Sequence, residues 1–123
     1  MKKIFITLAW FIFALNSQAQ DITPISNAIK AGNADVLTDK MATEVDIVVP
    51  GASKKSTGNE AIAILKSFFQ TNRPDDFTVA HHAGKNESGF FVGKLTSTNK
   101  EFRVNITYTS KDGGIFITVI RIE

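Results

Sequence analysis

The stretch TGNEAIAILKSFFQTN, from Thr57 to Asn72, predicts one amphipathic helix around which the rest of the chain is organised. Thr57 and Glu60 have the spacing of a capping box, in which each side chain bonds to the other residue's backbone N–H. Apolar residues recur at helical spacing and form one broad stripe: Ala61, Ile62, Leu65, Phe68 and Phe69. Pro74 lies just beyond Asn72 and cannot continue the helical hydrogen bonds. The stripe needs a facing surface, which we expect the C-terminal strands to supply.

Two shorter helices are predicted upstream of this central helix. The first covers residues 21–31, with Thr23 as its N-cap and Gly32 as its C-cap. The second covers residues 33–40 and is expected to turn three side chains inward: Val36, Leu37 and Met41. Neither helix is long enough to be stable alone, so both are expected to dock on another part of the domain.

The remaining segments are rich in β-branched and aromatic residues or alternate in polarity, which is typical of strands. The expected strands cover residues 44–49, 76–82, 90–97, 101–110 and 115–122, and residues 52–56 are expected to form a short extended piece that returns to the central helix. The last is apolar on both faces apart from Thr118 and Arg121, which favours a central position in the sheet. The order of elements predicts an α+β fold, in which the helices lie on the concave face of a curved antiparallel sheet.

The first nineteen residues have the features of an export signal rather than of the folded domain. Lys2 and Lys3 precede an apolar run over residues 4–15, and Ser17 and Ala19 place small residues at the cleavage site. We expect cleavage after Ala19, a single mature domain over residues 20–123, and a periplasmic or secreted location. No stable membrane anchor is then expected after cleavage. The alternatives are a buried N-terminal helix or a retained membrane anchor.

Charge and cysteine content exclude several functional classes. The chain has 14 lysines and arginines against 12 aspartates and glutamates, and the signal's Lys2 and Lys3 account for the excess. A neutral mature domain without a basic cluster argues against nucleic acid as a partner. The absence of cysteine excludes disulfides, thiolate metal sites and a cysteine nucleophile. No metal-spaced histidine set or phosphate-binding glycine loop is present, so no cofactor is expected.

The mature chain resembles a known protein family over residues 21–123. The resemblance is carried by the order of elements and by packing motifs: residues 64–69 (ILKSFF), Asn72, Pro74, Phe77, His81, Gly93 and residues 121–123 (RIE). These look like the small exported DUF4783 proteins of Bacteroidetes, within the NTF2-like (cystatin-like α+β roll) superfamily. The resemblance implies a cone-shaped domain that holds ligands on its concave side and dimerises through the open face of its sheet. It implies no particular biochemical activity.

His81 and His82 are the first candidates for a functional site. Neighbouring residues on a strand point to opposite faces, so the pair cannot easily chelate one metal ion. If Phe77 and Val79 face the helix, strict alternation turns His81 inward and His82 to solvent. His81 could then carry a proton or bind a ligand. The alternative, which we favour, is a histidine at the edge of the core that bonds to a backbone carbonyl or to Tyr108.

Three aromatic residues complete the predicted ligand-binding set with His81. Tyr108 shares a face with Phe102 and is either a phenol at a pocket mouth or, as we favour, a core aromatic whose hydroxyl reaches the surface. Phe69 and Phe77 belong to an aromatic interior that could line a ligand cavity, although aromatics at core spacing usually just pack. The acidic residues fall mostly at caps, turns and strand ends, so no catalytic residue is assigned.

Two functions are therefore open at the level of the sequence. The first is a non-catalytic module that binds an apolar small molecule or another envelope protein. The second is a small isomerase- or dehydratase-like enzyme with His81 and Tyr108 in the pocket. A homodimer through the outer sheet face is also expected, because four apolar strand residues could lie there: Phe91, Leu95, Ile117 and Val119.

Overall fold

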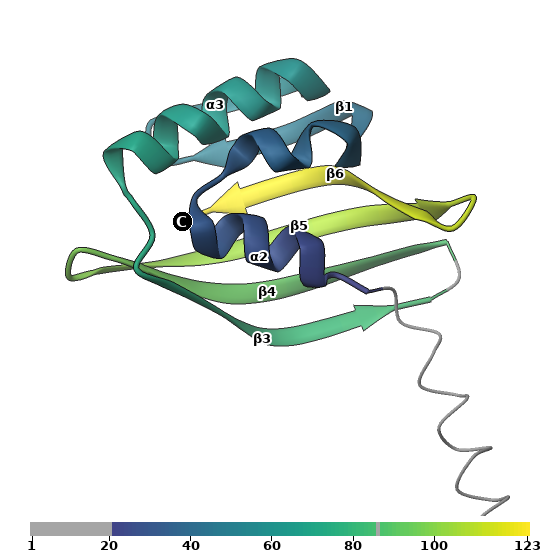
Figure 1. Cartoon of the computed structure of the whole chain (residues 1–123). Helices are drawn as coiled ribbons and strands as arrows, with labels where there is room; N and C mark the ends of the chain where they lie inside the picture. Colours follow the sequence, from purple (N-terminus) through teal and green to yellow (C-terminus); the bar gives the residue numbers. More distant parts are fainter. Residues whose placement is uncertain (1–20, 86) are drawn as a thin grey trace, which may run out of the picture.

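The computed structural model describes residues 21–85 and 87–123, which form three helical segments packed on one face of a curved sheet (Figure 1). The predicted signal peptide lies outside these residues. The elements in chain order are α2 (Thr23–Ala31), the 3₁₀ helix η1 (Ala34–Lys40), β1 (Met41–Val49), β2 (Ala52–Thr57), α3 (Gly58–Thr71), β3 (Asp76–Gly84), β4 (Ser88–Ser97), β5 (Lys100–Lys111) and β6 (Gly114–Ile122). The predicted α+β arrangement, with the helices on the concave side, is confirmed.

The strands form one six-stranded sheet in the order β2-β1-β6-β5-β4-β3. β3 to β6 pair as consecutive antiparallel neighbours, and β6 lies between β1 and β5, as predicted for the segment that is apolar on both faces. The pairing of β1 with β6 is parallel, so the sheet is not wholly antiparallel. Residue patterns within single strands do not show this long-range pairing, because it depends on where the chain returns after α3 and three further strands.

α3 covers the sheet with the apolar stripe predicted from the sequence. Its capping box is present: Thr57 Oγ1 accepts from the Glu60 N–H at 3.2 Å, and Glu60 Oε1 accepts from the Thr57 N–H at 2.9 Å. The five stripe residues are all buried. The Phe68 ring meets the Phe102 ring of β5 edge-on, with centroids 5.2 Å apart. The helix and the C-terminal strands therefore form one shared core.

The two N-terminal segments dock on this core, but with differences from the prediction. Thr23 makes no side-chain cap; instead, Asp21 Oδ1 accepts from the Thr23 N–H at 3.0 Å. Gly32 ends α2 in the left-handed conformation, as expected. η1 winds as a 3₁₀ helix, whose three residues per turn bury Leu37 and leave Val36 49% exposed. The predicted inward position of Val36 was wrong.

Three of the four apolar residues expected on the outer sheet face lie inside the core instead. Phe91, Leu95 and Ile117 are fully buried against the helices, whereas Val119 is half-buried. A bulge in β6 explains why Ile117 and Val119 differ: Val119 lies opposite Thr107, but Ile117 lies opposite Tyr108. One extra residue on β6 therefore places Ile117 and Val119 on opposite faces although they are two positions apart.

No helix within residues 21–85 and 87–123 combines the length and apolar character needed to cross a bilayer.

Candidate functional site

A bulge in β3 reverses the predicted directions of the two histidines. Val79 pairs with Gly93 of β4, but the next paired residue on β3 is His81, opposite Val92. Ala80 is the extra residue at this shift of register. Because each residue after a bulge changes face, His82 points inward beside the buried Phe91 and His81 is exposed on the outer face. The prediction that His81 faces inward and His82 faces solvent was therefore wrong.

His82 and Tyr108 form a polar pair on the inner face. His82 Nε2 lies 2.8 Å from the Tyr108 hydroxyl, a hydrogen bond in which the imidazole tautomer decides which group donates. The bonding role that we considered for His81 with Tyr108 is thus filled by His82. Burial lowers the pKa of His82, with the nearby His81 as a smaller cause, and burial raises the pKa of Tyr108. Both groups are therefore held in their neutral forms near pH 7.

Two glycines make room for the Tyr108 ring. A Cβ atom at Gly84 would lie 2.8 Å from the Tyr108 hydroxyl oxygen, and one at Gly89 would collide with the ring itself. The tyrosine therefore lies flat against the backbone where β3 and β4 meet, and its hydroxyl reaches His82. Tyr108 is fully buried, so it is a core aromatic rather than a phenol at a pocket mouth, but its hydroxyl reaches His82 and not the surface as expected.

Phe69 and Phe77, the other predicted ligand-binding residues, lie in the packed interior. Phe69 is 4% exposed and meets Phe68 edge-on, with ring centroids 5.8 Å apart. Phe77 is 6% exposed, meets Phe91 at 6.4 Å, and occupies the space that a side chain at Gly93 would fill. Their contact with a ligand stays a prediction, since both rings are engaged with protein atoms.

The inner face does not assemble the parts of an acid–base site among the described residues. His81 and Tyr108, the anchors of the enzymatic alternative, lie on opposite faces of the sheet. Neither His82 nor Tyr108 is hydrogen-bonded to a carboxylate in this part of the chain. No cluster of three or more metal-ligating side chains occurs there either. The His82–Tyr108 pair is therefore best described as a satisfied polar contact within the core.

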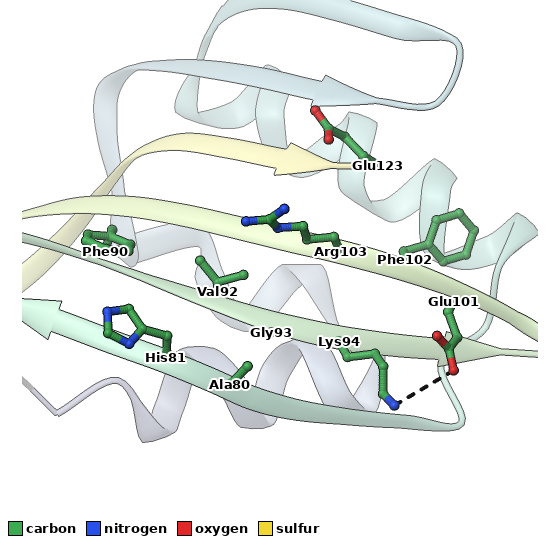
Figure 2. A pocket seen from close by; sticks show the side chains of 10 residues that line it. All are labelled: Ala80, His81, Phe90, Val92, Gly93, Lys94, Glu101, Phe102, Arg103 and Glu123. Atoms are coloured by element: carbon green, nitrogen blue, oxygen red, sulfur yellow. Dashed lines mark ion pairs between the residues drawn. The ribbon is translucent and has the colours of Figure 1, made fainter.

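The outer face of β3, β4 and β5 carries an open hollow with a volume of about 760 Å³ (Figure 2). It is lined by Ala80, His81, Phe90, Val92, Gly93, Lys94, Glu101, Phe102, Arg103 and Glu123. Val92 forms its floor, and the rings of His81 and Phe90 stand together at one end, with centroids 5.6 Å apart. Phe90 is 40% exposed although it is a large apolar side chain. The hollow thus joins apolar surface to charged groups.

The charged groups of the hollow are mostly paired with one another or with neighbours. Lys94 Nζ lies 3.8 Å from Glu101 Oε2, and Glu123 Oε2 lies 3.4 Å from the Arg121 guanidinium. Arg103 is held at its backbone, where its N–H donates to the Glu123 carbonyl at 2.8 Å and its carbonyl accepts from the Glu123 N–H at 2.9 Å. Its side chain has no hydrogen bond or ion pair with the described residues.

Sequence reasoning missed this hollow, although it contained signals for parts of it. The strict alternation of β5 predicts that Arg103 points away from the core, and the structure confirms this. The run Phe90–Val92 is apolar on both faces, which could have indicated an apolar patch on the outer side. The bulge at Ala80 brings His81 beside that patch, and no residue pattern in β3 predicts it.

Comparison with known proteins identifies relatives with the same fold. The family model for DUF4783, a domain of unknown function, matches residues 22–123. A DUF4783 protein from Bacteroides uniformis is 29% identical, with a TM-score of 0.77 over 82% of this chain and 94% of that one. One from Bacteroides ovatus is 32% identical, with a TM-score of 0.75 over 80% of this chain and 90% of that one.

A more distant structure extends the likeness in fold alone. An NTF2-like protein of unknown function from Cytophaga hutchinsonii has a TM-score of 0.58 at 9% identity, over 83% of this chain and 84% of that one. Among curated proteins, no sequence matches this chain significantly. The match over residues 22–123 shows that the chain belongs to the DUF4783 family, and the structural likeness shows that it has an NTF2-like fold.

Proposed function

We propose that this domain is a non-catalytic binding module and that the hollow on the outer sheet face is its binding site. The proposed occupant is a small, largely apolar molecule. The carrying observation is the hollow itself: about 760 Å³ of open space beside the half-exposed side chains of Phe90 and Val92. Ligand sites typically enclose roughly 300–1,000 Å³ and combine apolar walls with a few polar groups.

The packed interior supports this choice of site. The concave face, where superfamily members hold ligands, is filled by core side chains, including Phe69 and Phe77. Every buried side-chain nitrogen and oxygen in the described part of the chain has a hydrogen-bond partner. No buried polar group among the described residues therefore needs a ligand as its hydrogen-bond partner. The outer hollow, in contrast, exposes apolar surface to solvent.

The proposal includes an extracytoplasmic place of action. The signal-like residues 1–19 motivate a periplasmic or secreted domain. Such a domain would meet small molecules of the cell envelope. A second copy of the chain, seated on the outer sheet face, is the competing occupant, because a homodimer would bury the same apolar residues.

The test uses the neutral aromatic probe 2-naphthamide and the mature domain, residues 20–123, labelled with ¹⁵N. Titration should shift the backbone amide signals of β3, β4 and β5 around Ala80, Val92 and Arg103. A Val92→Gln variant should bind the probe roughly fivefold to tenfold more weakly, because apolar contact area is lost. Val119→Gln changes the same residue type on the same face, outside the hollow, and should leave binding unchanged.

Two outcomes would overturn the proposal. Shifts confined to other parts of the domain, or equal weakening by both variants, would remove the hollow as the site. Sedimentation of a stable dimer that excludes the probe, and that Val92→Gln dissociates, would show that a second copy occupies the face instead.

A further inference from the structure

The Arg103 side chain is the charged group that the hollow leaves without a partner among the described residues. Lys94 is paired with Glu101, and Glu123 is turned toward Arg121, which is not one of the lining residues. The Arg103 side chain is directed along the hollow toward its Phe90 end, and Val92 lines the same hollow (Figure 2). The hollow therefore presents the Arg103 guanidinium, which has no ion pair with the described residues, next to apolar surface.

The backbone holds this arginine in place. Arg103 and Glu123 exchange two backbone hydrogen bonds, of 2.8 and 2.9 Å, at the end of the β5–β6 ladder. On the other side, Arg103 pairs in register with Lys94 of β4. Because β5 is hydrogen-bonded to β6 on one side and to β4 on the other, the Cα atom of Arg103 is fixed. The guanidinium can therefore reach only a limited part of the hollow.

We propose that Arg103 makes the hollow a site for a small apolar molecule bearing a single carboxylate. The inference rests on the proposed function and specifies its ligand. The planar guanidinium donates two parallel hydrogen bonds to a carboxylate. The apolar body of the ligand lies along β4 over Val92, with its far end against the rings of Phe90 and His81.

The neighbouring charges favour one negative charge over two. The carboxylates of Glu101 and Glu123 line the same hollow, and each is balanced by one cation at 3.8 and 3.4 Å. A phosphate monoester also fits a guanidinium but brings about two charges near pH 7. Its second charge would face these carboxylates without a cation of its own. A monoanion is therefore the ligand that balances the site.

The experiment compares three probes with one ring system: 2-naphthoate, neutral 2-naphthamide and 2-naphthyl phosphate. Isothermal titration of the mature domain should show 2-naphthoate binding roughly tenfold more tightly than the amide, as expected for hydrogen bonds to a charged group. The phosphate should bind more weakly than the carboxylate.

The variants assign that preference to one side chain. Arg103→Gln should abolish the tenfold preference for the carboxylate over the amide, and Arg103→Lys should keep part of that preference because the charge is present without the planar fork. Arg73→Gln removes an exposed arginine from the loop before β3 and should have no effect.

The outcomes separate this inference from the proposed function. Equal binding of carboxylate and amide, or a preference that survives Arg103→Gln, overturns the role of Arg103 while the hollow stands as an apolar site. Tighter binding of the phosphate overturns the preference for a monoanion. Failure of all three probes to bind in the hollow overturns both proposals.

Discussion

The two faces of this sheet are built by alternate residues of the same strands, yet they differ completely in packing. On the inner face Phe91, Ile106 and Ile120 are at most 1% exposed, and they lie under the helices. On the outer face their neighbours Phe90, Asn105 and Arg121 face solvent or are half-buried. The face of the sheet on which a side chain lies, and not its residue type, therefore decides its role. Residues on the inner face stabilise the fold, and residues on the outer face are available for binding.

The largest difference between the two faces is expected for substitutions of the adjacent residues Phe90 and Phe91 on β4. Phe91→Ala should lower the free energy of unfolding by about 3–5 kcal/mol, because it removes a fully buried ring and leaves a cavity. Phe90→Ala, at a residue that is 40% exposed, should lower it by about 1 kcal/mol or less. Urea denaturation followed by circular dichroism measures both. Similar losses for the two variants would contradict the difference between the faces.

A smaller effect is expected where the backbone of β4 is crowded on its inner side. Gly93→Ala would push a methyl group into the Phe77 ring and to 2.8 Å from the Thr78 carbonyl oxygen. We expect a loss of about 1–3 kcal/mol in unfolding free energy, as for other overpacked sites. Gly114→Ala is the control, because its nearest atom would be 3.6 Å away. A harmless Gly93→Ala would mean that this part of the inner face is loosely packed.

The inner polar pair should contribute less than the apolar core around it. Tyr108→Phe removes the hydroxyl that lies 2.8 Å from His82 Nε2 and should lower the unfolding free energy by about 0.5–1.5 kcal/mol. Combining it with His82→Gln should give a loss smaller than the sum of the two single losses, because both changes break one hydrogen bond. Fully additive losses would show that the two side chains do not interact.

The smallest expected effect is a pH dependence that distinguishes the two histidines. Burial lowers the pKa of His82 in the folded protein, so the unfolded state binds more protons just below the ordinary histidine pKa of about 6.5. The stabilising contribution of neutral His82 is thus complete above that pH and is lost as the pH falls toward the lowered value.

The measurement is the unfolding free energy between pH 7.5 and 5 for the wild type and two variants. His82→Gln should flatten the slope in this window, whereas His81→Gln on the outer face should keep most of it, since His81 is the smaller cause of the shift. If the wild type instead gained unfolding free energy relative to His82→Gln as the pH fell, the predicted direction of the pH dependence would be wrong.

The family assignment, the helix and most strands were within reach of the sequence, but the site was not. The cap at Thr57, the stripe through Phe69 and the alternation of β5 are local patterns, and each produced the structure that it predicts. The directions of His81, Ile117 and Val119 were not predictable in this way, because each depends on a bulge in the pairing with another strand. The hollow was not predictable for the same reason, because residues of three paired strands and Glu123 line it.

The sequence alone predicts most of the elements and the apolar stripe of α3, because helix and strand periodicities are properties of consecutive residues. The three-dimensional arrangement is needed to show which histidine contacts Tyr108, that β1 and β6 run parallel, and that the Arg103 side chain has no partner in the described part of the chain. Those outcomes depend on register between distant segments. A shift of one residue at Ala80 is enough to turn every later side chain of β3 to the opposite face of the sheet.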